Sequence, residues 1–259
     1  MSTEDGPAGQ AGWHWPAGHD LILLDEVDST MAEARRRAPF ARPTWIAARR
    51  QTAAIGRRGR AWAAPEGNLS ATLAMQPDCP PAKAALFSFV ASYALFATLL
   101  AYVEDRTALS LKWPNDVLLS GGKLAGILLA SDGHGHKVTQ LSIGIGVNLN
   151  TAPAPVGLEP GQHPPVTLAD ATGDAIDPLE FLTFLAEHFA HQQRFFQDNG
   201  FGPLRAAWLD QAAKRGEEIT ARTGTEEVRG IFRTVDEDGQ LVLDTPRGQR
   251  VIAAADVFF

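Results

Sequence analysis

Short apolar runs separated by turn signals make up much of the chain. Runs of this length with Val, Ile and Leu are typical of buried β-strands. Hairpin-length turns such as Ser120–Gly122 separate several of them, which favours a mixed, largely antiparallel sheet over a repeating βαβ array. The runs expected to form strands are residues 21–24, 44–48, 69–75, 109–112, 117–119, 124–130 and 141–147.

Helical signals lie between these runs and after them. Asp28 or Ser29 can cap a helix through MAEARRR, and Asp177 followed by Pro178 is a typical start for a long helix with one apolar face. Another helix is expected over residues 203–214. Residues 84–103 carry no formal charge and are long enough to span a membrane. Their Ala- and Ser-rich composition favours a buried core helix instead, so we expect no membrane partner.

The pattern changes at Gly216 to period-two runs with short turns, as in EEVRGIFRTVDEDG. Several short strands of this kind predict a small appended β-barrel. The fold class is therefore α+β, a sheet packed by helices plus a small C-terminal barrel. We expect a flexible leader over residues 1–18, a main domain over residues 19–214 and the barrel over residues 215–259.

Composition narrows the possible compartments and partners. There are 23 Lys and Arg against 30 Asp and Glu, and the net charge of −7 argues against a surface that tracks nucleic acid. Cys79 is the single cysteine, so an intramolecular disulfide and a cysteine zinc cluster are both excluded. The N-terminus is acidic and lacks the apolar core of a signal peptide. We expect a cytoplasmic protein.

One basic cluster stands out in this acidic chain, the segment Gly56-Arg57-Arg58-Gly59-Arg60. Its glycines allow close backbone approach to a ligand, and its guanidinium groups can bind phosphate or carboxylate with two hydrogen bonds. Phosphate binding and a plain solvated turn are about equally supported by this segment alone, and nucleic-acid binding is less so.

Three further segments carry polar residues next to strands. An amide and a carboxylate lie at a corner fixed by proline in Lys112-Trp113-Pro114-Asn115-Asp116, where they could bind a metal ion or a nucleotide. An ordinary Asn-Asp turn would have the same sequence. Lys123 begins an apolar strand and Gly126 follows it, which fits either a phosphate-neutralising lysine or the charged end of a hairpin. Gly144 and Gly146 alternate on one strand face before Asn148, which clears room for a flat or extended ligand.

Together and in this order, these segments resemble the catalytic domain of biotin protein ligases. The match begins with Asp28-Ser29-Thr30, continues through residues 51–62, and includes K-W-P-N-D at residues 112–116, K-L-A-G-I at residues 123–127 and G-I-G-V-N at residues 144–148. The resemblance extends to the C-terminal barrel. The chain departs from the family pattern at two places. Ala54-Ile55 replaces the first Gly-Arg of the loop, which removes one positive charge, and Met31 stands where Asn is common.

The resemblance implies an ATP-dependent ligase that acts in two steps. Biotin and ATP, with Mg²⁺, would give biotinyl-5′-AMP, and a lysine of a biotin carboxyl carrier protein or domain would then accept the biotinyl group. The resemblance also implies a class II synthetase-like catalytic fold with an SH3-like terminal barrel. Lys123 and Arg57 would be the catalytic residues, and Asp116 would contact Mg²⁺, which is held largely by phosphates.

The remaining roles are carried over residue by residue. The resemblance places Ser29, Thr30, Met31, Gln51, Ile55, Gly56, Arg57, Lys123, Gly126 and Gly144 around biotin. It places Arg57, Arg58, Arg60, Trp62, Lys112, Asn115, Asp116, Lys123 and Asn148 around ATP and the adenylate.

Other outcomes remain open at this stage. A lipoate or octanoate ligase shares the core fold and the adenylate chemistry, and a non-catalytic module could use the basic loop and barrel only for binding. Only about 20 residues precede the first strand, so we expect the monofunctional type, without a helix-turn-helix domain and without DNA binding. Edge-strand pairing would allow a homodimer. We expect His134 and His136 to be exposed and not metal-binding, and Cys79 to be inert.

Overall fold

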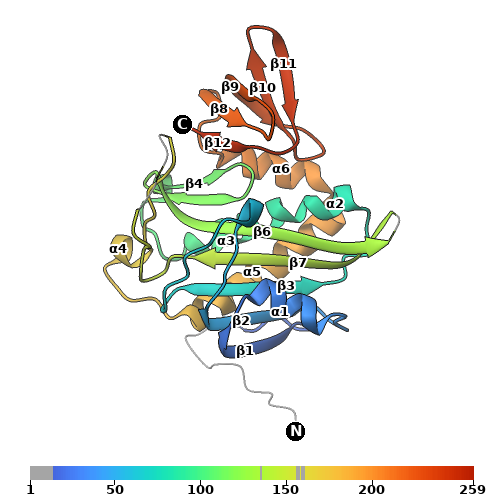
Figure 1. The fold of residues 1–259 in the computed structure, drawn as a ribbon, viewed down its shortest axis with the longest axis vertical. Helices are drawn as coiled ribbons and strands as arrows, with labels where there is room; N and C mark the ends of the chain where they lie inside the picture. The colour runs from blue at the N-terminus through green and yellow to red at the C-terminus, as the bar shows by residue number, and fades with distance from the viewer. Residues whose placement is uncertain (1–13, 135, 156–157, 159–160) are drawn as a thin grey trace.

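A computed structural model describes residues 14–134, 136–155, 158 and 161–259. A large seven-stranded sheet carries a smaller five-stranded sheet at one end (Figure 1). The strands of the large sheet are β1 (Asp20–Val27), β2 (Thr44–Gln51), β3 (Leu69–Met75), β4 (Leu109–Lys112), β5 (Asp116–Leu119), β6 (Gly122–His134) and β7 (Lys137–Val147).

The large sheet has the order β1-β2-β3-β7-β6-β5-β4. β1 and β2 are parallel and the other neighbours are antiparallel, which confirms the predicted mixed sheet. β6 and β7 are longer than expected because they continue past the apolar core into an exposed hairpin. In their register Gly126 lies opposite Gly146, so two glycines meet on neighbouring central strands.

Helices cover the sheet unequally. α3 and α5 pack against each other and against one face of the sheet, whereas α1 lies over β2, β3 and β7 on the other face (Figure 1). The site described below lies beside α1 on that less covered face. The helices are α1 (Thr30–Arg37), α2 (Pro81–Ala85), α3 (Phe87–Leu99), α4 (Ala169–Thr172), α5 (Pro178–Asn199) and α6 (Phe201–Asp210), with 3₁₀ turns η1 (Arg57–Gly59) and η2 (Arg106–Ala108).

Local capping explains where the helices start. Ser29, rather than Asp28, accepts the backbone N–H of Ala32 at the start of α1. Asp177 accepts two N–H groups at the start of α5, as predicted, and Pro178 fills the first helical position. The helix expected over residues 203–214 lies earlier, at Phe201–Asp210.

The apolar stretch before β4 forms two helices broken at Leu86. Residues Pro81–Leu99 meet the length and hydropathy of a membrane span, but 67% of the apolar window is buried inside the structure. Val90, Ala94 and Leu95 are fully buried in the core. The prediction of a buried core helix is confirmed.

The C-terminal strands form an antiparallel sheet of order β11-β10-β9-β8-β12. Among the described residues its edge strands β11 and β12 are not paired with each other, so the barrel expected from the sequence is open. β12 faces the large domain. The strands are β8 (Glu218–Arg222), β9 (Glu227–Val235), β10 (Leu241–Thr245), β11 (Gly248–Ile252) and β12 (Asp256–Phe258).

Packed structure begins earlier than the sequence indicated. Trp15 lies against the main core and donates a hydrogen bond to the carbonyl of His19 at 2.9 Å. This part of the predicted leader is therefore attached to the domain. Residues 1–13 lie outside the described residues, and the prediction of flexibility there stays a prediction.

Candidate functional site

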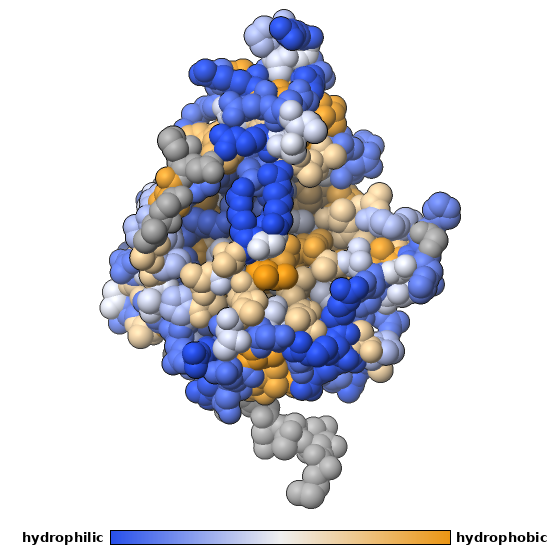
Figure 2. Space-filling model, viewed as in Figure 1, coloured by the Kyte–Doolittle hydropathy of each residue, from blue (hydrophilic) through white to orange (hydrophobic). Residues whose placement is uncertain are grey.

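A pocket of about 280 Å³ opens beside α1, between the large sheet and β12. Figure 2 shows the hollow at the centre of this face, with hydrophilic residues across it and hydrophobic residues beside them. Four cationic side chains and two carboxylates line the pocket, so it is locally positive within a chain of net charge −7. Those charged side chains are Arg57, Arg60, Lys112, Lys123, Asp116 and Asp256.

One end of the pocket is a network of uncharged polar groups. The Gln51 side-chain oxygen accepts the backbone N–H of Thr30 at 2.8 Å and the Thr30 hydroxyl at 3.2 Å. Because a backbone N–H can only donate, the Gln51 amide must turn its oxygen to Thr30, which leaves its NH₂ group as a donor. Thr72, fully buried on β3, donates to the Thr30 hydroxyl at 2.8 Å and fixes this arrangement. With the Ser29 hydroxyl nearby, this end can bind a ligand that offers hydrogen-bond acceptors.

The middle of the pocket is built on the glycine pair of β6 and β7. A Cβ atom at Gly146 would lie 2.6 Å from the indole nitrogen of Trp62, and one at Gly126 would lie 3.1 Å from the same ring. At Gly144 it would lie 2.9 Å from the sulfur of Met31. The space cleared by these glycines is therefore taken by Trp62 and Met31, which corrects the expectation that a ligand fills it directly. The indole becomes the flat surface that a ligand meets.

Gly146→Ala tests this packing. The added methyl group collides with the indole from the sheet side, so the ring or the strand must move, and we expect the free energy of unfolding to fall by about 1–3 kcal/mol. Urea denaturation measures the change. Gly202→Ala is a matched control, because no atom lies within 4 Å of a Cβ there and α6 gains an alanine. Equal stability of the two variants would contradict the packing of Trp62 on Gly146.

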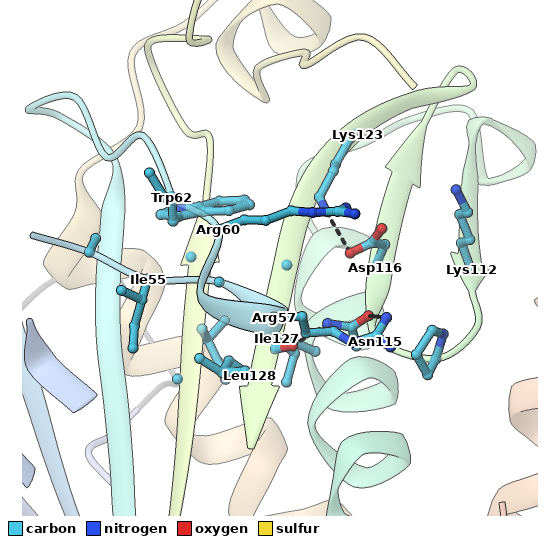
Figure 3. Close-up of a pocket in the computed structure, with 18 of the residues that line it drawn as sticks. Ile55, Arg57, Arg60, Trp62, Lys112, Asn115, Asp116, Lys123, Ile127 and Leu128 are labelled. Carbon is cyan, nitrogen blue, oxygen red and sulfur yellow. Dashed lines mark hydrogen bonds and ion pairs between the residues drawn. The ribbon is translucent and has the colours of Figure 1, made fainter. Parts of the chain in front are cut away.

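Lys123 connects the middle of the pocket to its charged end. Its ammonium nitrogen lies 2.8 Å from an Asp116 carboxylate oxygen and 5.5 Å from the centre of the Trp62 ring (Figure 3). A parallel bridge to Pro165 beside the start of β6 holds its backbone. Arg60 extends from the loop toward Lys123 and Asp116 (Figure 3). An anionic ligand resting on the indole would lie close to the Lys123 ammonium.

The arginine loop, residues 54–62, closes over the pocket as a small hairpin. Gly56 N–H bonds to the Arg60 carbonyl at 2.7 Å and Trp62 N–H to the Ala54 carbonyl at 2.9 Å. Arg57 donates to the Asn115 side chain at 3.2 Å and to the carbonyl of Ala255 at 3.0 Å. The loop is thus tied to the K-W-P-N-D corner and to the C-terminal sheet.

Burial perturbs two cations here. Burial lowers the pKa of the Arg57 guanidinium, an effect opposed by Asp256 and Asp116. Burial also lowers the pKa of Lys112 to about 8, with Asp116 opposing the shift. The Lys112 ammonium lies 5.0 Å from the centre of the Phe259 ring, and only 8% of the residue is exposed. A poorly solvated cation of this kind favours an anionic partner.

The structure brings most of the predicted site residues together, with two exceptions. Arg58 does not line the pocket; it has a positive φ of 55° and binds Asp256 at its edge. Asn148 is 2% exposed and also lies outside the lining, where its amide donates to the backbone carbonyl of Lys123 at 3.4 Å. The predicted residues that line the pocket are Ser29, Thr30, Met31, Gln51, Ile55, Gly56, Arg57, Arg60, Trp62, Lys112, Asn115, Asp116, Lys123, Gly126 and Gly144.

Several residues that form or support the pocket were not predicted from the sequence. Thr72 could not be identified as a site residue, because a threonine within an apolar run is common in any β-strand. Asp256 and Phe258 line the pocket from the C-terminal sheet, and Gln162 and His163 line it from the proline-rich loop. Proline-rich composition identified that loop but not its place at the pocket.

Two smaller predictions concern His134, His136 and Cys79. His134 and His136 are exposed, as expected. The described residues contain no group of three or more His, Cys, Asp or Glu suited to a metal, and the expectation that these two histidines bind none stays a prediction. Cys79 is buried, and burial raises the pKa of its thiol, which disfavours the reactive thiolate. The expected inertness of Cys79 stays a prediction.

Comparisons with known proteins agree with this geometry. Residues 23–148 match the biotin/lipoate A/B protein ligase family, and residues 215–259 match the biotin protein ligase C-terminal domain. The chain is 49% identical to a biotin--[acetyl-CoA-carboxylase] ligase of Paracoccus denitrificans over 92% of this chain and 99% of that protein. It is 31% identical to the bifunctional ligase/repressor BirA of Bacillus subtilis, over 93% of this chain and 74% of that one. A solved biotin protein ligase of Aquifex aeolicus in complex with biotin and ATP aligns with a TM-score of 0.79 and 26% identity, over 92% of this chain and 98% of that one.

Proposed function

This chain belongs to the biotin/lipoate A/B protein ligase family, and on that basis we propose that its pocket activates biotin with ATP and passes the biotinyl group to a carboxylase's carrier lysine. The observation that carries the proposal is the position of Lys123. Its ammonium lies against the Trp62 indole on one side and the Asp116 carboxylate on the other. A carboxylate lying on the indole would meet this cation beside the arginine loop.

The uncharged polar end suits the ureido ring of biotin. Gln51 presents an NH₂ donor and Ser29 a hydroxyl, which together match a ring carbonyl that accepts hydrogen bonds. The Thr72–Thr30–Gln51 chain would keep the amide in this orientation without reorganisation. Met31, Ile55 and Gly56 would enclose the apolar remainder of the ligand, with Gly126 and Gly144 packed behind Trp62 and Met31. These roles rest on the pocket lining and on the family membership.

The charged end suits the phosphates of ATP. A biotin carboxylate oxygen attacks the α-phosphorus, the bond to pyrophosphate breaks, and biotinyl-5′-AMP forms. Two anions must approach each other in this step, so cations stabilise the charge that develops. We assign Lys123 to the meeting point of the reacting carboxylate and the α-phosphate, because its ammonium lies beside the indole and because Arg57, Arg60 and Lys112 line the same pocket.

Magnesium would be held mainly by the phosphates. Asp116 is the pocket carboxylate nearest to Lys123, and the described residues offer no cluster of three protein ligands, so the donor set fits an ion that keeps phosphate and water ligands. Bound Mg²⁺ would neutralise phosphate charge. Asn115 and Trp62 would complete the nucleotide side, and Asn148 would act by holding the backbone of Lys123.

The second step needs a lysine from outside the pocket. The neutral amine of a carrier lysine attacks the acyl carbon of the mixed anhydride, AMP leaves, and an amide bond forms. AMP is a better leaving group than the oxygen of a free carboxylate, which is the chemical reason for the first step. The carrier is a biotin carboxyl carrier protein or domain of a biotin-dependent carboxylase.

Pyrophosphate exchange into ATP tests the first step. With Mg²⁺ present we expect exchange that depends on biotin and that octanoate and lipoate do not support. Exchange driven by octanoate or lipoate would make the chain a lipoate or octanoate ligase. No exchange with any of the three acids would favour a non-catalytic binding module.

The lowered pKa of Lys112 leads us to expect that ATP binding depends on pH. This pKa is lowered to about 8, so the side chain is charged below that pH and neutral above it in the free enzyme. We expect the Kd for ATP to rise by about tenfold between pH 7 and pH 9, because the attraction between Lys112 and the phosphates is lost. Titration calorimetry across this range measures it. Lys112→Met should bind weakly at both pH values, and a Kd of the parent chain that is constant with pH would refute the role.

Three expectations remain predictions. β1 and β4 are the edges of the large sheet, and Leu23 on β1 is 54% exposed, which leaves strand pairing in a homodimer open to test. The expected lack of DNA binding and the expected cytoplasmic location are also predictions.

A further inference from the structure

Asp256 joins the C-terminal sheet to the arginine loop. It begins β12, the edge strand that pairs with β8, and its side chain is only 15% exposed. One of its carboxylate oxygens lies 2.9 Å from Arg58 and 3.0 Å from Arg60, and the other lies 3.7 Å from Arg57. Three guanidinium groups of one loop therefore share one carboxylate, almost 200 residues away in the sequence.

Repulsion between the positive charges of the loop disfavours its observed conformation, and the Asp256 carboxylate offsets this repulsion. Three guanidinium groups within four residues repel one another, and η1 is a single 3₁₀ turn with Arg58 at a positive φ. Within the described part of the chain, the arginine side chains reach other elements at Asn115, Ala255 and Asp256. Two of these three residues belong to the C-terminal domain, Asp256 at the start of β12 and Ala255 directly before it.

Asp256 leaves the arginines able to bind a ligand. A guanidinium group has five N–H donors, and Arg58 and Arg60 each use one of them on Asp256. Arg60 lines the pocket, so its remaining donors can bind phosphate oxygens while the carboxylate still fixes its head group. Asp256 also lines the pocket. The carboxylate can therefore orient the arginines without leaving when an anion arrives.

We propose that Asp256 is a positioning residue that holds the arginine loop in its phosphate-binding shape, so that the C-terminal sheet takes part in nucleotide binding. The inference rests on the proposed function, because it assumes that the loop binds the phosphates of ATP. If Asp256 only competed with ATP for the arginines, removing its carboxylate would strengthen ATP binding instead of weakening it.

The test compares Asp256→Asn with the full-length parent chain. We expect the Kd for ATP to rise at least about tenfold, with a biotin Kd in the absence of ATP that stays within about twofold. At saturating ATP, the single-turnover rate should fall by less than about threefold. Asp256→Glu should restore most of the ATP affinity. Glu218→Gln is the control, because Glu218 pairs with Arg229 at 2.8 Å within the C-terminal sheet, and it should bind ATP normally.

Limited trypsin digestion separates positioning from general damage. Asp256→Asn should speed cleavage after Arg57, Arg58 and Arg60 and leave cleavage after Arg229 and Arg233 in β9 unchanged. An ATP Kd that is unchanged or lower, or loop cleavage that is not faster, would overturn the inference. Faster cleavage in β9 would overturn it too, because the sheet itself would then be disrupted. A parent chain that binds no ATP would instead refute the proposed function.

Discussion

Replacing Lys123 with alanine is expected to slow adenylate formation by about 10²–10³-fold while changing the Kd for biotin by less than about tenfold. The Lys123 side chain is one-third exposed, so water screens the attraction of its ammonium for a resting carboxylate. When that carboxylate attacks a phosphate, negative charge concentrates where the ammonium lies. The interaction is therefore stronger in the transition state than in the bound substrate. Rapid quenching of a single turnover gives the rate, and titration calorimetry gives the Kd.

The pair with Asp116 complicates the alanine variant. Removing Lys123 also takes away the ammonium that lies 2.8 Å from the Asp116 carboxylate. The Asp116 side chain is only 17% exposed, so an unpaired negative charge would remain in a pocket that we expect to bind anions. The double variant Lys123→Ala/Asp116→Asn removes this leftover charge. We expect it to recover only a small part of the lost rate. Near-normal turnover of Lys123→Ala would contradict the role of Lys123, and full recovery in the double variant would show that the unpaired carboxylate caused the defect.

The second large effect is expected from Arg57→Gly. This variant should release biotinyl-5′-AMP about 30–100-fold faster than the parent chain, while adenylate still forms at a rate within about tenfold of normal. Arg57 ties the loop to Asn115 and to the carbonyl of Ala255, and its side chain is 27% exposed. Without it, the loop loses its hydrogen bonds to Asn115 and to Ala255 and is held only through Arg58 and Arg60 on Asp256.

Release of labelled adenylate after dilution into unlabelled biotin and ATP measures retention. Arg57→Ala separates the lost side chain from the added backbone freedom of glycine, and it should show most of the effect. Arg57→Lys keeps a cation without the planar fork and should lie between the parent chain and Arg57→Ala. Retention equal to that of the parent chain in Arg57→Gly would refute the closing role of the loop.

Local sequence signals predicted the strands, the cap at Asp177 and the motifs that line the pocket. These features depend on neighbouring residues, such as an apolar run, a capping side chain or a proline at a corner. The glycine pair illustrates the limit of such signals. Gly146 indicated cleared space, but only the register that sets it opposite Gly126 and the fold of the loop show that Trp62 occupies that space.

Residues that act from a distance could not be predicted. Asp256 reads in the sequence as an ordinary acidic residue near the last strand, and its three arginine partners lie almost 200 positions earlier. Thr72 likewise acts through its neighbour Thr30. Asn148 was predicted as a nucleotide contact, but its amide bonds to the backbone of Lys123 instead. Such roles follow from how the strands pack.

Transfer of biotin to a carrier tests the central claim most directly. The chain is incubated with labelled biotin, ATP, Mg²⁺ and an apo biotin carrier domain, and the carrier is analysed by mass spectrometry. We expect one biotinyl group on a single carrier lysine, dependent on ATP, and no transfer when that lysine is replaced by arginine. Transfer of octanoate or lipoate in place of biotin, or no acyl transfer at all, would contradict the account.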